Sequence, residues 1–240
     1  MSYSLPNTEE KSVYVEKMFN KIAKKYDQFN NIITFGLHRK WKRFVAQQTK
    51  LHDENSCLDL CCGTGDIARE LLRQYPSSKV TGLDFSEEML NIAESKNNSE
   101  ITVKYMLGDA MNIPFPDQEF NAVTIGFGMR NVKDISQFLR EILRVLKPEG
   151  VLVSLDVGKV HIPILSELNN IYFFHIVPLI GKILIPGEEI FKYLPESSIE
   201  YPDQVSLTNL MIDAGFQNVE FYNFVFGAST VHVAYKPTQN

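Results

Sequence analysis

Apolar residues recur at helical spacing in the first fifty residues of the chain, with basic residues between them. One face of the first segment carries Val15, Met18, Phe19, Ile22 and Tyr26. These positions follow the i, i+3, i+4, i+7 spacing of a single helix face, and lysines occupy the opposite side. The pattern repeats over residues 38–50, so the sequence predicts two consecutive amphipathic helices.

From residue 56 onward, short apolar runs alternate with helical patterns. The predicted strands cover residues 56–61, 79–83, 101–106, 120–125 and 151–157. Helices are predicted over residues 66–75, after the capping residue Ser86, and over residues 135–147. Because parallel neighbours need crossover helices and bury both faces, this alternation predicts an α/β fold with a doubly wound, mostly parallel sheet.

The alternation ends near residue 158. Residues 162–193 are rich in Ile, Leu, Phe and Tyr without a strand period, which predicts two or three inserted helices. Two final apolar segments, residues 218–224 and 229–235, predict an antiparallel hairpin.

Charge is distributed unevenly along the chain. The 240 residues carry 24 Lys and Arg against 29 Asp and Glu, a net charge of −5. Residues 11–43 hold nine basic and two acidic side chains, so this segment is +7 and the remainder is −12. The overall acidity argues against a general nucleic-acid binder, because binding phosphates needs a basic surface.

The three cysteines lie together at positions 57, 61 and 62, too close and too apolar for a disulfide framework or a zinc site. We therefore expect no metal. The first ten residues are polar and carry no apolar signal-peptide core, and the apolar run 171–181 is interrupted by Pro178. A cytoplasmic location is expected.

Glycines follow the first predicted strand in the order Gly63-Thr64-Gly65, with Ala68 three residues later. Glycines at this point allow a tight turn and close approach of a ligand to the backbone. Asp84 follows 19 residues after Gly65, at the end of the next strand, where a carboxylate can bind ribose hydroxyls. The spacing predicts an adenosine-containing cofactor without choosing between NAD and S-adenosylmethionine.

Three acidic positions favour S-adenosylmethionine. Asp59 precedes the glycines, where a carboxylate would repel a pyrophosphate but can bind a cationic amino group, and Asp66 adds a second negative charge. Asp109 and Ala110 follow the third strand, where an adenine would lie. An acidic cleft suits a cationic sulfonium donor.

These motifs resemble the class I methyltransferases and, within them, the ubiquinone/menaquinone biosynthesis C-methyltransferase family. The resemblance covers residues 13–237 and is carried by segments 25–30, 35–42, 58–66, 114–117, 126–132, 145–148 and 213–216. The stretch Gly126-Phe-Gly-Met-Arg130-Asn131-Val132 is its most specific part. One departure is Asp156, where the family usually has Glu at the end of the fifth strand.

The resemblance implies methyl transfer from S-adenosylmethionine to a ring carbon of a prenylated quinol. Demethylmenaquinol is the first expected acceptor and a polyprenyl-methoxy-benzoquinol the second. We expect one domain, divided into an N-terminal helical lid (1–50), a cofactor-binding core (51–157), a helical substrate insertion (158–200) and a C-terminal helix with a hairpin (201–240). The residues expected to bind the donor are Asp59, Gly63, Thr64, Gly65, Asp84, Asp109, Ala110 and Gly126.

Arg130 is too basic to act as the base and is expected to stabilise the developing phenolate or to polarise a water that takes the proton. His38, His175 and His232 are rivals for removing the proton, with His38 in the specific N-terminal segment. Small residues around Phe127, namely Gly126 and Gly128, are expected to leave room for the ring. Tyr26, Phe127, Asn131, Phe173 and Phe174 are the expected substrate residues. An apolar channel for the tail would be lined by Phe173, Phe174, Ile176, Leu179 and Ile183, and Asp27 is expected to close over the cofactor with Tyr26.

Other functions stay open at this point. They are a methyltransferase with a sterol or other lipid-like acceptor, a nicotinamide oxidoreductase, and a non-catalytic S-adenosylmethionine-binding or lipid-carrier protein. The basic N-terminal helices also predict peripheral contact with an anionic membrane surface, through Lys17, Lys21, Lys24 and Lys25.

Overall fold

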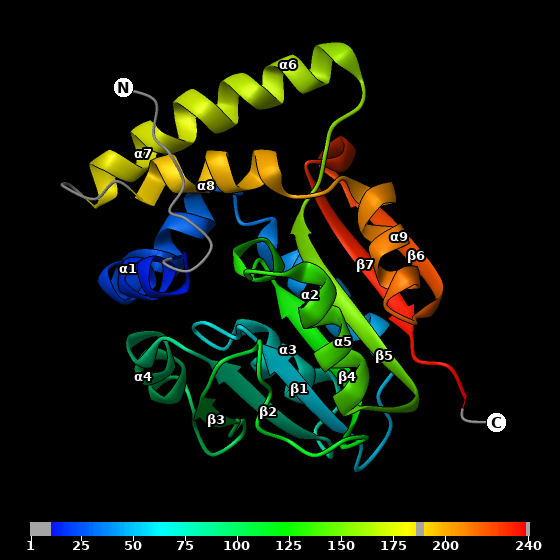
Figure 1. The fold of residues 1–240 in the computed structure, drawn as a ribbon. Coiled ribbons are helices and arrows are strands. Elements are labelled where there is room, and N and C mark those ends of the chain that lie inside the picture. The colour runs from blue at the N-terminus through cyan, green and yellow to red at the C-terminus, as the bar shows by residue number, and fades with distance from the viewer. Residues whose placement is uncertain (1–10, 186–189, 239–240) are drawn as a thin grey trace.

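The computed structural model describes residues 11–185 and 190–238, and expectations for residues 1–10, 186–189 and 239–240 lie outside this range. A seven-stranded sheet has the order β3-β2-β1-β4-β5-β7-β6 (Figure 1). The strands are β1 (Ser56–Leu60), β2 (Lys79–Asp84), β3 (Lys104–Leu107), β4 (Phe120–Gly126), β5 (Leu146–Val157), β6 (Gln217–Phe224) and β7 (Ser229–Tyr235).

The first five strands are parallel, and β7 pairs antiparallel with both β5 and β6. The predicted fold class is thus confirmed, including the C-terminal hairpin. The strand order reverses between β1 and β4, and in open α/β sheets ligands bind outside the carboxyl ends of the strands at such a point.

Helices connect β1 to β2, β2 to β3 and β4 to β5, whereas residues 108–119, between β3 and β4, form no helix. Further helices lie above the carboxyl ends of the strands (Figure 1). The helix bounds are α1 (Lys11–Ile33), α2 (His38–Gln48), α3 (Asp66–Gln74), α4 (Glu87–Ser95), α5 (Ile135–Val145), α6 (Pro163–Ile171), α7 (Val177–Leu184), α8 (Ile190–Glu200) and α9 (Gln204–Asp213). Short turns of helix are η1 (Met129–Asn131), η2 (Tyr172–Ile176) and η3 (Val225–Gly227).

Two apolar cores cover the two faces of the sheet. Trp41 and Val45 of α2 and Leu71 of α3 pack with one face, whereas Phe138 of α5 and Met211 of α9 pack with the other. Strands buried on both faces read as continuous apolar runs, which is why periodicity alone located most of them.

A third core lies above the carboxyl ends of the strands. It joins Val15, Met18 and Ile22 of α1 to Met89 of α4 and Val177 of α7. In Figure 1, α1, α6, α7 and α8 gather at this end of the sheet. None of the helices in residues 11–185 and 190–238 has the length and apolar character needed to cross a bilayer.

Two predicted boundaries are wrong for local reasons. Strand β3 begins at Lys104 because the Asn97 and Asn98 side chains hold residues 100–103 in a turn through hydrogen bonds to backbone N–H groups. Strand β5 begins at Leu146, which pairs with Phe120, so the preceding helix ends at Val145.

Candidate active site

The turn between β1 and α3 offers open backbone at the carboxyl edge of the sheet. Gly63 and Gly65 have φ values of 52° and 77°, in the left-handed region that side chains disfavour. A Cβ added to Gly63 would meet no atom within 4 Å, so space lies directly against this backbone. A Cβ on Gly65 would instead overlap the hydroxyl of Tyr105. The first glycine thus admits a ligand and the second admits a neighbouring ring.

Asp84 ties the glycine turn to the next helix. Its Oδ2 accepts a hydrogen bond from the N–H of Gly63 (2.7 Å), and its Oδ1 accepts one from Ser86 (2.9 Å). Burial raises the pKa of Asp84 to about 6, although these hydrogen bonds oppose the rise. Ser86 in turn caps α4, as predicted, by accepting from the N–H of Met89.

Asp59 lies beneath the turn with both carboxylate oxygens engaged. Oδ1 accepts from the Thr124 hydroxyl (2.7 Å) and Oδ2 from the N–H of Ala68 (3.1 Å), while only 1% of the residue is exposed. Burial raises the pKa of Asp59 to about 7. Asp59 therefore supports the start of α3 from below, and its expected contact with the donor stays a prediction.

Asp109 and Ala110 complete the edge, following β3. The N–H of Gly108 donates to the Asp84 carbonyl (2.9 Å), which brings the two strand ends together. Asp109 is exposed and accepts a hydrogen bond from Met111, and Ala110 is buried. An adenosine-containing ligand needs space against a glycine backbone and a carboxylate close by. The glycine turn and the buried Asp84 provide both, so these residues fit such a ligand.

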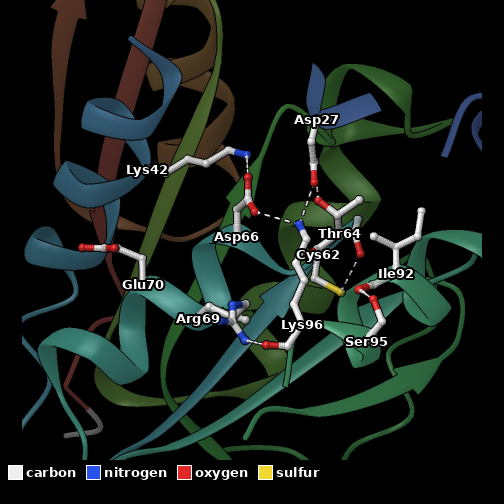
Figure 2. A network of polar contacts seen from close by, with 12 residues as sticks. Asp27, Lys42, Cys62, Thr64, Asp66, Arg69, Glu70, Ile92, Ser95 and Lys96 are labelled. Atoms are coloured by element: carbon white, nitrogen blue, oxygen red, sulfur yellow. Dashed lines mark hydrogen bonds and ion pairs between the residues drawn. The ribbon is translucent and has the colours of Figure 1, made fainter. Parts of the chain in front are cut away.

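A charged network joins this turn to α1 and α2 (Figure 2). Thr64 donates its hydroxyl to Asp27 of α1 (2.6 Å). Lys96 donates to Asp27 (2.7 Å), to the Thr64 carbonyl (3.0 Å) and to Asp66 (3.1 Å), and Lys42 of α2 donates to Asp66 (2.7 Å).

This network changes the interpretation of Asp66. Although burial opposes it, Lys42 and Lys96 hold the pKa of Asp66 below its ordinary value. The expectation that Asp66 presents an extra negative charge to the donor is wrong, because two ammonium groups balance that charge. Lys42 likewise is not part of an exposed basic surface, since its side chain is only 13% exposed.

A cavity of about 620 Å³ lies between the helices above the sheet. Six expected residues line it, with Arg130 contributed by η1: Tyr26, His38, Phe127, Arg130, Phe173 and Phe174. Other lining residues come from α1, α2, α6 and the turn after β6, among them Met18, Ile22, Phe29, Trp41, Leu168 and Phe226. The volume lies within the range of small-molecule sites, and aromatic and aliphatic side chains predominate.

Arg130 forms a buried ion pair at the wall of this cavity. Its Nη1 lies 2.6 Å from Oδ1 of Asp156 and also donates to the carbonyl of Phe127 (2.8 Å). The guanidinium carbon lies 5.7 Å from the centre of the Phe127 ring, a cation–π distance. Although burial opposes it, Asp156 raises the pKa of Arg130, so the side chain is a permanent cation. Its buried Nε has no hydrogen-bond partner within the described residues.

Among the three candidate histidines, His38 is the one that lines the cavity. It is 4% exposed, and neither ring nitrogen has a hydrogen-bond partner in the described part of the chain. Burial, followed by the charge of Lys42, lowers the pKa of His38 to about 4, so the ring is neutral near pH 7. His232 instead binds the Gln204 carbonyl with Nε2, and His175 is exposed outside the cavity lining.

Three other expectations are corrected. Gly126 and Gly128 leave no space for a ring, because Ile67 and Cys61 occupy the positions where their side chains would lie. Asn131 does not line the cavity but accepts a hydrogen bond from the hydroxyl of Tyr193 (3.0 Å), which does.

The expected tail channel is also only partly correct. Ile176, Leu179 and Ile183 are 41%, 55% and 71% exposed and do not line the cavity. They lie on the outer side of η2 and α7, because Val177 and Gly181 turn the inner side of that segment toward the core.

Sequence reasoning missed Trp41, Tyr193 and Lys96. Trp41 belongs to the predicted helix 38–50 and to the resemblance segment 35–42, but neither assigned it to the site, and Lys96 follows a helix at an ordinary surface position. Only the spatial approach of α1 and α4 reveals that Lys96 reaches the glycine turn. In the part of the chain that the structure describes, no group of three His, Cys, Asp or Glu side chains could hold a metal ion.

Comparisons with known proteins agree with this arrangement. The model of the ubiE/COQ5 methyltransferase family matches residues 7–236. A protein of Leptospira interrogans (strain Fiocruz L1-130), named demethylmenaquinone methyltransferase, is 45% identical over 244 residues, covering 99% of this chain and 98% of the relative. A protein of the same name from Staphylococcus aureus (strain JH9) is 39% identical over 227 residues, covering 94% of each chain.

The fold has solved counterparts as well. A SAM-dependent methyltransferase of Thermotoga maritima, described as a possible histamine N-methyltransferase, aligns with a TM-score of 0.63 at 20% identity, covering 92% of this chain and 99% of the other. At this identity the likeness shows the fold alone, which is that of the class I methyltransferases.

Proposed function

The chain belongs to the ubiE/COQ5 methyltransferase family and is therefore a methyltransferase, with S-adenosylmethionine as its methyl donor; we propose that its acceptor is a ring carbon of demethylmenaquinol. The observation that carries this proposal is the apolar cavity of about 620 Å³ whose wall holds a buried arginine and an unpartnered histidine. The names of the two relatives support the same acceptor.

S-adenosylmethionine supplies an electrophilic methyl group on a cationic sulfur. We assign the binding of its adenosine part to the Gly63 backbone, Asp84, Asp109 and Ala110, on the grounds of open backbone and an adjacent carboxylate. Asp59 and Thr64 support the turn from within. The chain's remaining task is to orient the acceptor ring, exclude water and remove a phenolic proton.

The cavity suits a flat ring with an apolar tail. Phe127 directly follows β4 and Arg130 lies in η1, three residues further on. Strand β4 pairs with β1, the strand that leads into the glycine turn. The end of the cavity next to Phe127 and Arg130 thus lies beside the donor site. Phe173 and Phe174 of η2, in the helical insertion, also line the cavity, and we assign them to the tail.

We assign proton removal to His38 and charge stabilisation to Arg130. A neutral imidazole can accept the proton of a quinol hydroxyl, and neither His38 nitrogen has a partner among residues 11–185 and 190–238. Arg130 is too basic to accept a proton, but its Nε–H, also without a partner in these ranges, can donate to the phenolate oxygen that forms. Burial strengthens this interaction, because no water screens the two charges.

Peripheral membrane contact is the second part of the proposal, since the acceptor's tail dissolves in lipid. Five large apolar residues line the cavity and are also exposed, and we call them the apolar rim: Phe35, Leu168, Ile199, Val225 and Phe226. Phe35 and Phe226 are 81% and 67% exposed and lie in left-handed conformations, with φ of 51° and 57°. Such backbone costs stability, and Phe35 packs one face against the ring of Tyr172, at 6.3 Å between centroids, while most of its side chain stays in solvent, which favours a functional role.

Two basic side chains lie close to the apolar rim in the sequence. Arg39 and Lys40 are exposed at the start of α2, four and five positions after Phe35. An anionic lipid surface offers both the apolar and the electrostatic partner that this combination requires. The acceptor would then enter the cavity directly from the bilayer.

The test is transfer of labelled methyl from S-adenosylmethionine to a prenylated naphthoquinol under reducing conditions. We expect label on the reduced ring and none on the oxidised quinone, which has no phenolic proton to lose. A prenylated methoxy-benzoquinol in a parallel reaction measures the ring preference. Absence of label on both quinols would contradict the proposed acceptor.

A further inference from the structure

The central residue of the glycine turn is held by two elements outside the turn. The hydroxyl of Thr64 donates to Asp27 of α1, and its carbonyl accepts from the ammonium group of Lys96, directly after α4 (Figure 2). Lys96 also binds Asp27 at 2.7 Å, so the three residues close a triangle of hydrogen bonds.

Lys96 uses its full donor capacity in this arrangement. An ammonium group has three N–H donors, and the acceptors of Lys96 are Asp27, Asp66 and the Thr64 carbonyl. Asp66 is the first residue of α3, immediately after the turn. One side chain therefore contacts α1, the middle of the turn and the helix that follows the turn.

Helix α1 is at the same time a wall of the large cavity. Met18, Ile22, Tyr26 and Phe29 line the cavity from this helix, and Tyr26 is the neighbour of Asp27 in the chain. A change in the position of Asp27 relative to the turn moves the residue that faces the acceptor. Helix α1 thus contacts both the glycine turn and the acceptor cavity.

We propose that Lys96 and Asp27 are positioning residues that couple the two binding sites, so that occupation of the glycine turn fixes α1 and pre-forms the acceptor cavity. This inference rests on the proposed function, because it assigns the cavity to the acceptor. Coupling of this kind is reciprocal, so the acceptor must strengthen donor binding by the same factor. The ion pair itself is partly exposed, with 27% and 40% of the two side chains accessible, which allows it to form and break.

The experiment follows hydrogen exchange of the α1 backbone with and without S-adenosylhomocysteine, the demethylated product of the donor. In the unmodified chain we expect this product to slow exchange over residues 11–33 by about tenfold, within the usual range of coupling factors. In Lys96→Met and Asp27→Ala we expect less than about a twofold change in α1, while the glycine turn at residues 61–65 is still protected.

Two controls separate coupling from general destabilisation. Glu16→Ala removes an acid from the same helix, and Lys104→Met removes an exposed lysine from the neighbouring strand β3. Both should retain the full protection of α1. Lys96→Arg retains the positive charge and should restore part of the effect, which a purely structural role of the aliphatic stem would not require.

A second readout uses Trp41, the single tryptophan of the chain, which lines the cavity. Titration of a short-tailed naphthoquinol, followed by its fluorescence, gives the acceptor affinity with and without S-adenosylhomocysteine. We expect a ratio of about ten in the unmodified chain and a ratio near one in Asp27→Ala. Calorimetry of S-adenosylhomocysteine alone verifies that each variant still binds it.

The possible failures are distinguishable. Unchanged α1 exchange on product binding in the unmodified chain, or full protection in both Lys96→Met and Asp27→Ala, would overturn the coupling even if labelled quinol forms. Protection of α1 that depends on Lys96, without methyl transfer to any quinol, would support the link between the turn and α1 and reject the proposed acceptor.

Discussion

Arg130 and Asp156 form an ion pair of 2.6 Å that is almost closed to solvent, with side-chain exposures of 7% and 3%. The same carboxylate accepts a hydrogen bond from the backbone N–H of Arg130 (3.2 Å), so Asp156 holds both ends of this residue. The shorter Asp156, where the family usually has Glu, thus suffices to reach the guanidinium group. The pair fixes the arginine at the cavity wall, and we assign its buried Nε–H, which has no partner among the described residues, to the acceptor.

Asp156→Asn tests this orientation. Removing one partner leaves a buried guanidinium without its counter-charge, which typically costs about 3–5 kcal/mol of folding stability. We expect kcat for quinol methylation to fall by about 10²-fold or more, because the charge that stabilises the phenolate is no longer held in place. The affinity for S-adenosylhomocysteine should change little.

The matched control for this substitution is Asp117→Asn. Asp117 pairs with Arg144 at 2.9 Å on the surface, with 71% of its side chain exposed. Such pairs contribute about 0–1 kcal/mol, so neither stability nor kcat should change noticeably. Similar losses in the two variants, measured by urea unfolding and initial rates, would contradict the special role of the Arg130–Asp156 pair.

His38→Gln tests the proposed proton acceptor. The glutamine fills similar space but cannot take a proton, so we expect kcat to fall by about 10²–10⁴-fold with the KM for the donor unchanged. His175→Gln, at an exposed position outside the cavity, is the control and should be fully active. Full activity of His38→Gln would show that His38 is not the proton acceptor and would assign that role to a water beside Arg130.

The pH dependence of stability provides a second readout for His38. Its pKa is about 4 in the folded chain, below the ordinary value of 6.5. The unfolded chain therefore binds the extra proton first as pH falls, and stability is lost between about pH 6.5 and 4. Because the pKa values of Asp59 and Asp84 are raised to about 7 and 6 and act in the opposite direction, the difference between His38→Gln and the unmodified chain is the quantity to measure.

Gly82 and Tyr105 provide a test of packing beneath the donor site. A Cβ on Gly82 would lie 2.7 Å from Cδ1 of Tyr105 and 2.9 Å from the sulfur of Cys62. Gly82→Ala should therefore lower stability by about 1–3 kcal/mol through overpacking. In a Tyr105→Ala background, the additional loss caused by Gly82→Ala should be smaller, because the ring that Cβ would displace is gone.

Gly65→Ala is the contrasting case, measured in the same urea titrations. Gly65 also lies against Tyr105, but its φ of 77° strains any side chain. Adding Tyr105→Ala should consequently rescue Gly65→Ala less than Gly82→Ala. Equal rescue at the two positions would show that contact with the ring, rather than backbone strain, accounts for both losses.

The features that depend on residues close together in the sequence were the ones predicted correctly. The alternation of apolar runs and helices predicted the parallel sheet because strand burial and crossover geometry are encoded locally, and the spacing from Gly65 to Asp84 placed both at one edge. The cavity residues Tyr26, His38, Phe127 and Arg130 were also anticipated, since the family resemblance identified their segments.

The errors concern contacts between segments distant in sequence. Nothing near Gly126 indicates that Ile67 fills its side-chain space, and nothing near Lys96 indicates Asp27, which lies 69 positions earlier. Asp66 was assigned a free charge because the approach of Lys42 from α2 depends on tertiary packing. Local patterns report burial and spacing, whereas the partner of a charge depends on how helices meet.

The last prediction concerns the membrane surface, where two features compete. Lys17, Lys21, Lys24 and Lys25 of α1 are exposed, but helical spacing places Lys17 and Lys24 on a different face from Met18 and Ile22, which line the cavity. The apolar rim surrounds the cavity itself. If the acceptor enters from the bilayer, the rim must face the lipid, and the α1 lysines contribute only longer-range attraction of about 1 kcal/mol each.

Flotation with vesicles of phosphatidylcholine, with and without phosphatidylglycerol, distinguishes these contributions. Phe35→Ser/Phe226→Ser should weaken binding to anionic vesicles and raise the KM for a long-tailed quinol, but not for a tail-free ring.

Reversal of Lys17, Lys21, Lys24 and Lys25 to Glu should reduce vesicle binding mainly at low salt, because the Debye length shortens as salt rises. Val205→Ser/Ile212→Ser removes two apolar residues of α9 that are 58% and 52% exposed, and it should change neither vesicle binding nor the KM for the long-tailed quinol. An equal loss in this control would show that exposed apolar area, rather than the rim, determines lipid binding.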